Sequence, residues 1–327
     1  MTMSENKIRK AAELTIGAAG IGLLVSSFVL FIQNLTRRKP DPDELKKMSP
    51  DEKRLYVLRK RSYEWTRRQK TEKVVIESDD GLKLDATFLS NPANKNGGPR
   101  KVVLFSHGYG GRSIWDMGIF ARYYFNKGFD ILFPDQRAHG KSEGKYITMG
   151  AWESADLAEW AKWICGRCGD DCRIIVHGWS MGAASAYLSV KYMPDQVKGV
   201  VFDCGYASVY DQFTYVGKLM LPKVPDVLIR AIVFVMNFWT RVITGFYLKD
   251  ASPIDDAEDL HLPIFFVHGS ADKFVPCGSG MKLYAATKAP YKDKLVVPGA
   301  GHVMSWLYDC KGYTDGIDRL IDNCMPD

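Results

Sequence analysis

The sequence RIIVHGWSMG, residues 173–182, decides the fold of this chain. Its first half is an apolar run typical of a buried strand, and residues 183–188 after it are typical of a helix. The pentapeptide Gly-Trp-Ser-Met-Gly between them predicts a tight strand-to-helix turn, since the flanking glycines lack a Cβ atom that would clash. Such a turn pushes the hydroxyl of Ser180 out at the carboxyl end of the sheet, where it can act as a nucleophile.

A serine hydroxyl needs a base, and the base needs a carboxylate that orients it. The expected chain order for this turn is nucleophile, acid, histidine. Of six histidines, His302 is the one in the last stretch, after a strand-like run at 294–297. Two aspartates fit the order: Asp272 in the loop after a run at 263–267, and Asp203 at the end of a run at 197–202.

Hydrogen-bond donors for a developing oxyanion are also expected. One is the backbone N–H of Met181, directly after the nucleophile. The other should come from the loop after an earlier strand, and the strand-like run 101–106 leads into His107-Gly-Tyr-Gly-Gly111. We assign this second donor to Tyr109, with Gly110 as the alternative, and interpret His107 as a structural histidine.

Five motifs follow one another along the chain: H-G-Y-G-G at His107, D-Q-R-A-H-G-K-S at Asp135, G-W-S-M-G at Gly178, H-G-S-A-D-K-F-V-P at His268 and G-A-G-H at Gly299. With them, the chain from Lys73 onward resembles the α/β-hydrolase superfamily of serine hydrolases, most of all its bacterial esterase and serine aminopeptidase-like branch. The resemblance implies hydrolysis through an acyl-enzyme on Ser180. It favours Asp272 over Asp203 as the acid, because the loop around Asp272 carries the family pattern, and it makes 135–137 a structural loop.

The N-terminus carries a second signal. Residues 14–36 contain no charge, and about 20 residues suffice to cross the hydrocarbon core of a bilayer. A cleaved signal peptide, the alternative, has a shorter apolar core of about 7–15 residues and a small-residue cleavage site, whereas QNLTRR follows here at 33–38. We therefore expect a short basic tail at 1–13 and a retained single-pass transmembrane anchor at 14–36.

Basic residues are more numerous after this span than before it, so the positive-inside rule predicts a cytoplasmic catalytic domain at the cell membrane. Residues 37–72 form a charged linker. It is either an amphipathic helix on anionic headgroups or a solvated linker helix. The net charge of +6 owes much to this segment and argues for a membrane surface, not for nucleic acid.

Residues 73–327 form the predicted hydrolase domain. Apolar strand-like runs alternate with helix-like ones, which predicts an α/β fold with a mostly parallel central sheet and helices on both faces. The alternation breaks at about 206–250, which we interpret as a helical cap insertion above the site. The many apolar residues of this cap favour a pocket for a hydrophobic acyl group, or contact with lipid. The simpler interpretation is that its side chains pack the cap onto the core.

Seven cysteines, an odd number without a regular framework, indicate a reducing compartment. Three of them, Cys165, Cys168 and Cys172, lie close together but lack a fourth ligand, so we expect no metal and no cofactor. The sequence predicts a membrane-anchored serine hydrolase that cleaves carboxylic esters of hydrophobic acyl groups. A thioesterase, acyltransferase or peptidase with the same triad, and a membrane-tethered binding module on this fold, remain alternatives.

Overall fold

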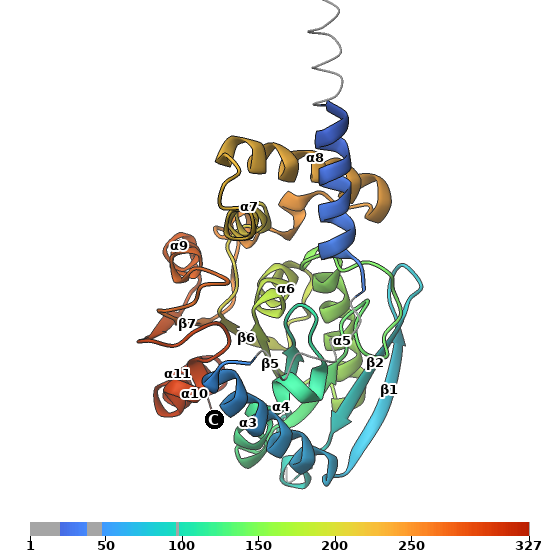
Figure 1. Ribbon diagram of the computed structural model, residues 1–327. Helices are drawn as coiled ribbons and strands as arrows, with labels where there is room; N and C mark the ends of the chain where they lie inside the picture. The colour runs from blue at the N-terminus through green and yellow to red at the C-terminus, as the bar shows by residue number, and fades with distance from the viewer. Residues whose placement is uncertain (1–19, 38–47, 96–97, 327) are drawn as a thin grey trace, which may run out of the picture.

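A twisted β-sheet forms the centre of the molecule (Figure 1). The computed structural model describes residues 20–37, 48–95 and 98–326. Within them the sheet has eight strands in the order β1-β2-β4-β3-β5-β6-β7-β8. β1 and β2 are antiparallel to their neighbours, and all pairings from β4 to β8 are parallel, which confirms the predicted mostly parallel sheet. The strands are β1 (Thr71–Glu77), β2 (Lys83–Leu89), β3 (Lys101–Ser106), β4 (Asp130–Pro134), β5 (Arg173–Trp179), β6 (Val197–Asp203), β7 (Ile264–Gly269) and β8 (Lys292–Val297).

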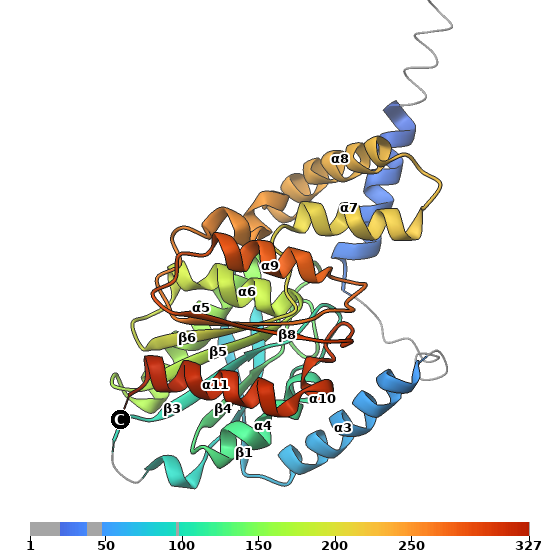
Figure 2. The same ribbon diagram turned by 90° about the vertical axis from the view of Figure 1, so that its left-hand side faces the viewer.

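Helices cover both faces of the sheet, as predicted (Figures 1 and 2). Successive side chains of a strand point to opposite faces. Val102 and Leu104 of β3 therefore join one core cluster, while Val103 and Phe105 join the other. Because both faces of these strands are buried, their sequences are continuous apolar runs. The first cluster is covered by α5 (Ala151–Cys168), α6 (Met181–Ser189) and α9 (Cys277–Ala286), and the second by α3 (Pro50–Arg67), α4 (Ser113–Asn126), α10 (Ser305–Tyr308) and α11 (Cys310–Cys324).

Helix α3 lies in the stretch that was expected to link the anchor to the hydrolase domain, and it packs on that domain instead. Ser49 and Glu52 form a capping box that starts it. Its Leu55 is buried in the second cluster, and Arg59 forms an ion pair of 3.2 Å with Asp116 of α4. One face of α3 therefore contacts neither lipid nor water, and the domain begins well before residue 73.

The cap insertion consists of α7 (Val209–Met220), α8 (Asp226–Thr244) and the short 3-10 helices η3 (Leu248–Ala251) and η4 (Pro253–Asp256). Figures 1 and 2 show α7 and α8 beyond the main body of the molecule, on the side of α6 and α9. Their inner side chains, including Phe213, Val233 and Met236, belong to a third core cluster that also contains Met181. The simpler packing interpretation therefore holds for this inner face. Two other 3-10 turns, η1 (Pro92–Lys95) and η2 (Val190–Tyr192), lie elsewhere.

The N-terminal helix (Gly20–Leu35) lies beside the cap (Figure 2). Its Phe28 ring contacts Trp239 of α8 at 4.9 Å, and Phe31 and Leu35 are fully buried in the third cluster. The first part of the predicted anchor, residues 14–19, lies outside the described residues. The C-terminal end of the predicted anchor is thus part of the domain core. Among the described residues α8, by length and composition, could cross a bilayer, while the N-terminal helix is shorter.

Candidate active site

Ser180 occupies a sharp turn between β5 and α6. Its φ of 55° and ψ of −125° lie outside the regions that residues with a side chain prefer. Glycines make this turn feasible: a Cβ atom on Gly178 would lie 2.2 Å from the Gly182 carbonyl oxygen, and one on Gly182 would lie 2.1 Å from the Ser106 carbonyl oxygen. The turn is held by a 2.8 Å hydrogen bond from the Ser180 N–H to the Asp203 carbonyl. The pentapeptide spacing is therefore a packing requirement.

Three side chains from distant loops meet at this turn. His302, in the loop after β8, has Nε2 at 2.9 Å from Ser180 Oγ, and its Nδ1 lies 2.7 Å from Asp272 Oδ2. An ionised carboxylate only accepts, so Nδ1 carries the proton and donates it to Asp272. That tautomer leaves the Nε2 lone pair facing the Ser180 hydroxyl, which is the arrangement a general base needs.

The Asp272 carboxylate is held from several sides in the loop after β7. Its Oδ1 accepts two backbone N–H groups, those of Phe274 and Val275, each at 2.9 Å. His268 Nε2 lies 3.4 Å from Oδ2 and donates to the Val275 carbonyl. Burial alone would raise the pKa of Asp272, but its bonds to His268 and His302 outweigh burial and hold that pKa well below the usual range. Asp272 therefore stays charged at neutral pH, and His268 is a supporting residue that the sequence did not reveal.

Asp203, the alternative acid, lies at the end of β6 and is paired with a residue of α11. Its Oδ2 accepts a 2.9 Å hydrogen bond from the Tyr313 hydroxyl of α11, and its Oδ1 is buried without a hydrogen-bond partner. Burial is the main cause that raises the pKa of Asp203 to about 7. The carboxylate that reaches His302 is therefore that of Asp272.

The loop after β3 lies directly against the nucleophile, as expected for an oxyanion site. A Cβ atom on Gly108 would lie 3.3 Å from Ser180 Cβ. The Gly110 N–H donates to His139 Nε2 at 3.0 Å, so the amide of this alternative donor is already engaged. The Tyr109 hydroxyl donates to the Asn34 carbonyl at 2.7 Å, which ties this loop to the N-terminal helix. Met181 is buried at the start of α6.

The remaining buried histidines have structural partners. His107 Nε2 accepts from the Gln136 N–H at 3.0 Å, in agreement with a structural role. His177 lies between two tyrosine hydroxyls at 3.0 and 3.1 Å. Burial lowers the pKa of both His139 and His177 to about 3, so both are neutral at physiological pH. Only His302 combines contact with Ser180 and contact with a carboxylate.

The loop 135–137 is structural, as the resemblance implied. Arg137 is buried and pairs with Asp156 at 2.6 Å and with Asp80 at 3.0 Å. Asp135 accepts the N–H groups of Ser113 and Lys141. These bonds fix the loop after β4 beside His107 and His139 without contributing a group to Ser180.

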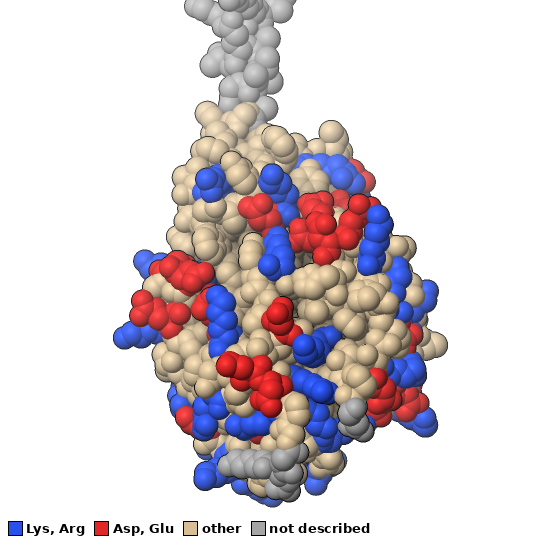
Figure 3. All heavy atoms as spheres, turned by 180° about the vertical axis from the view of Figure 1, so that it is seen from behind, with Lys and Arg blue, Asp and Glu red and all other residues tan. Residues whose placement is uncertain are grey.

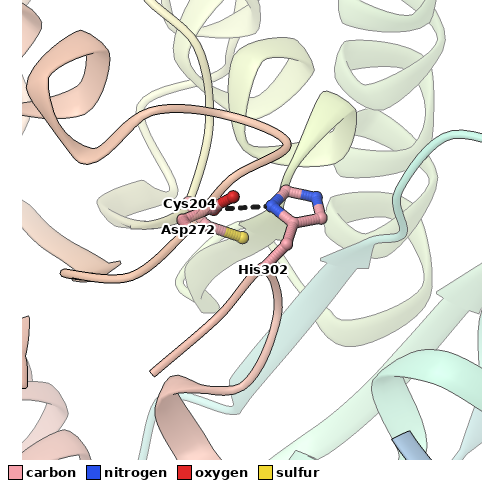
Figure 4. A group of neighbouring side chains, drawn as sticks. All are labelled: Cys204, Asp272 and His302. Carbon is pink, nitrogen blue, oxygen red and sulfur yellow. Dashed lines mark hydrogen bonds and ion pairs between the residues drawn. The ribbon is translucent and has the colours of Figure 1, made fainter. Parts of the chain in front are cut away.

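Cys204 is a neighbour of the site that the sequence did not reveal (Figure 4). Among the described residues, Cys204, Asp272 and His302 are the one set of three possible metal ligands, with ligand atoms within 4.8 Å of one another. Burial and two nearby aspartates raise the pKa of the Cys204 thiol well above its usual value. A protonated thiol is a poor ligand, and Asp272 and His302 are already bonded to each other. The donor set therefore suits a hydrogen-bonded pair better than a metal.

Comparisons with known proteins agree with this fold. A family profile described as the alpha/beta hydrolase fold matches residues 101–236. The uncharacterized protein YqkD of Bacillus subtilis (strain 168) is 23% identical over 95% of both chains, and the alpha/beta hydrolase domain-containing protein WAV2 of Arabidopsis thaliana is 24% identical over 78% of this chain and 80% of its own. Among solved structures, the esterase Pf2001 of Pyrococcus furiosus superposes with a TM-score of 0.62 at 23% identity, covering 79% of this chain and 92% of its own.

Proposed function

Because this chain belongs to the α/β-hydrolase superfamily, we propose that it is a membrane-anchored serine hydrolase that cleaves carboxylic esters of hydrophobic acyl groups. The observation that carries this proposal is the continuous hydrogen-bonded line from Ser180 through His302 to Asp272. Such a line, built on a strained turn, activates a hydroxyl for attack on a carbonyl carbon.

The proposed reaction has two halves. Ser180 Oγ attacks the ester carbonyl carbon while its proton passes to His302 Nε2, and the Asp272 carboxylate stabilises the resulting imidazolium. The tetrahedral oxygen accepts hydrogen bonds from the N–H groups of Met181 and Tyr109. His302 then protonates the departing alcohol, which leaves an acyl-enzyme. Water attacks that acyl group with His302 again as the base, and the acid and free Ser180 are released.

The preference for a hydrophobic acyl group rests on what surrounds the nucleophile. Met181 belongs to the third cluster, to which the cap and the N-terminal helix contribute apolar side chains such as Phe213, Val233 and Phe31. Ser180 itself is only 5% exposed. Because so little of Ser180 is exposed, we expect the cap to move when substrate enters.

Membrane attachment rests on the uncharged stretch 14–36 and on the basic residues after it. The described part of that stretch exposes large apolar side chains, among them Ile21 and Val25 at 65% and 56%. An exposed apolar helix of this kind is costly in water and favourable in lipid. The basic flank places the hydrolase domain in the cytoplasm in this proposal.

The test is turnover by the full chain in detergent on p-nitrophenyl esters of graded acyl length, with acyl-thioester and aminoacyl-amide substrates alongside. The full chain is used because removing the N-terminal helix would expose the core around Phe31 and Leu35. We expect ester hydrolysis that rises with acyl length, and none from Ser180→Ala. Turnover of aminoacyl amides alone would overturn the esterase proposal, and equal turnover by Ser180→Ala would overturn the serine mechanism.

A further inference from the structure

Helix α8 is apolar on two opposite faces, and only one of them has a partner. Its buried residues Ile229, Val233, Met236 and Thr240 follow helical spacing and point into the domain. A second set at the same kind of spacing lies on the opposite side and is exposed: Val227 at 75%, Phe234 at 69%, Phe238 at 54% and Val242 at 62%. A helix that is apolar on two opposite faces is suited to contact with an apolar partner or medium on each of them. We therefore expect the exposed outer face of α8 to contact an apolar partner or medium.

This outer face is continuous with the exposed side of the N-terminal helix. The two helices are joined by the contact of Phe28 with Trp239 and by a 3.0 Å hydrogen bond from Trp239 Nε1 to Ser27 Oγ. Seen from behind, charged side chains are sparse on the surface directly below the grey trace (Figure 3). Most of the large apolar side chains that the described residues expose lie here: Ile21, Leu24, Val25, Phe28, Val29, Ile32, Leu219, Met220, Leu221, Val227, Leu228, Phe234, Phe238 and Val242.

The length of the anchor determines how close the cap lies to the bilayer. A helix rises 1.5 Å per residue, so residues 14–26, which precede the contact with Trp239, would span only about 20 Å as a helix, against about 30 Å for the hydrocarbon core. Below that contact, Phe31 and Leu35 are enclosed by the domain. The anchor can therefore cross the hydrocarbon core only if Phe28 and Trp239 lie within the bilayer. Because Trp239 belongs to α8, this helix would then lie at the surface of the bilayer.

We propose that the outer face of α8, with the end of α7 at Leu219 to Leu221, docks into the near leaflet of the bilayer that holds the N-terminal anchor. The helix would lie in the plane of the membrane and not cross it. Its inner face is part of the third cluster, and its Asn237 side chain accepts the Leu248 N–H at 2.7 Å, so it cannot leave the domain to span.

Lipid suits this surface better than a second copy of the chain. Residues 209–244, which hold α7 and α8, carry four basic residues against two acidic ones, which favours anionic headgroups at the rim of the docked face, and two like surfaces would repel each other. The basic residues are Lys218, Lys223, Arg230 and Arg241, and the acidic ones are Asp211 and Asp226.

Docking would set where substrate enters. The inner face of α8 lies in the same cluster as Met181, the residue after the nucleophile. With its outer face in the leaflet, the cap brings the site next to lipid acyl chains, so the substrates would be esters that reside in the bilayer. This consequence rests on the proposed hydrolase function, whereas the docking itself rests only on the surface and the anchor.

A site-specific photocrosslinker tests the docking directly. The full chain, with p-benzoyl-phenylalanine in place of Phe234, is reconstituted in phosphatidylcholine–phosphatidylglycerol vesicles that contain an alkyne-bearing phospholipid. The matched control carries the crosslinker in place of Val75, which is 58% exposed on β1, far from the cap. We expect at least a tenfold excess of lipid adduct at position 234, given the strong partition of a buried aromatic ring.

Equal lipid adducts at positions 234 and 75 would overturn the proposal, and so would chain-to-chain adducts at 234, which would identify a second copy as the partner. Melting curves by circular dichroism check that both variants fold. Adding Phe238→Gln and Val242→Gln should reduce the lipid adduct at 234 about tenfold, since two apolar anchors are lost. A fluorophosphonate probe on the same samples reports the nucleophile separately, so failure of docking and failure of the proposed catalysis are distinguishable.

Discussion

Two aspartates lie near the carboxyl ends of neighbouring strands, Asp203 at the end of β6 and Asp272 in the loop after β7, and their surroundings give them opposite properties. Asp272 accepts two backbone N–H groups and the His302 imidazole, which keep it ionised. Asp203 is buried against Tyr313, and burial raises its pKa to about 7. A carboxylate that must stabilise an imidazolium has to be charged, so only Asp272 is suited to the task.

We predict that Asp272→Asn lowers kcat by about 10³–10⁴-fold, because the neutral amide no longer fixes the His302 tautomer. Steady-state ester hydrolysis at saturating substrate measures it. Asp203→Asn is the matched control and should retain kcat within a few-fold. If Asp203→Asn were the crippled variant, the acid role would belong to Asp203.

Asp203 and Asp272 are expected to change the stability of the folded chain in opposite directions as pH rises. The raised pKa of Asp203 means that the folded chain holds a proton which the unfolded chain loses above about pH 4, so this group lowers stability as pH rises toward about 7. Asp203→Asn should therefore gain in Tm relative to the parent chain between pH 5 and pH 8. The lowered pKa of Asp272 gives the opposite sign: its contribution is present above about pH 4 and is lost on acidification.

Thermal melts across that pH range, in the same detergent, make the comparison. A Tm difference between Asp203→Asn and the parent chain that stays constant from pH 5 to pH 8 would contradict a raised pKa for Asp203.

Residue identities near the site were predictable where the chemistry dictates the spacing. Ser180, His302 and the two glycines of the turn could be read from the sequence, because few other residues can occupy those positions. The order alone left both Asp203 and Asp272 open as the acid, and the family resemblance favoured Asp272. His268 and Cys204 could not be identified in this way. Each follows or ends a buried strand and reaches the site only through the register of β6 beside β7, which the sequence does not specify.

At the scale of elements, the N-terminal helix has two environments along its length. Ile21 is 65% exposed, while Phe31 is fully buried with Met181 and the cap. We predict that Phe31→Ala lowers the stability of the full chain by about 3–5 kcal/mol, the usual cost of removing a buried ring. Ile21→Ala, the control, should leave the unfolding midpoint in detergent unchanged. Equal midpoints for both variants would mean that the helix is a tether without a role in the core.

The elements that sequence patterns miss are those whose partners lie far away in the chain. The strands and the cap were predictable, because a buried strand or a long apolar insertion leaves a local pattern. The packing of α3 on α4, and of Phe31 under the cap, depends on contacts between distant segments. A charged segment such as α3 looks the same in sequence whether its apolar side faces lipid or another helix.

At the scale of the whole molecule, the N-terminal helix and the cap lie on one side of the sheet (Figures 1 and 2), and both contribute to the core cluster that contains Met181. Attachment and substrate entry would therefore share one surface. Helix α11, which begins at the exposed Cys310, lies on the other side of the sheet from the cap (Figure 2). The orientation of the whole domain can thus be tested at a single side chain.

We predict that Cys310, which is exposed, reacts with a membrane-impermeant maleimide only after cells are permeabilised, because the basic flank of the anchor holds the domain in the cytoplasm. Cys310→Ser is the control and should remove most of the label. Labelling of Cys310 on intact cells would place the domain on the outer side.

Identifying the residue that acts as the nucleophile is the most direct test of the proposed enzyme as a whole. The full chain is treated with a fluorophosphonate probe, digested and mapped by mass spectrometry. The modified peptide should be the one that contains Ser180, with no label in Ser180→Ala and a strongly reduced rate of labelling in His302→Ala. Label on a different residue, or equal labelling of the parent chain and Ser180→Ala, would contradict the proposed serine mechanism.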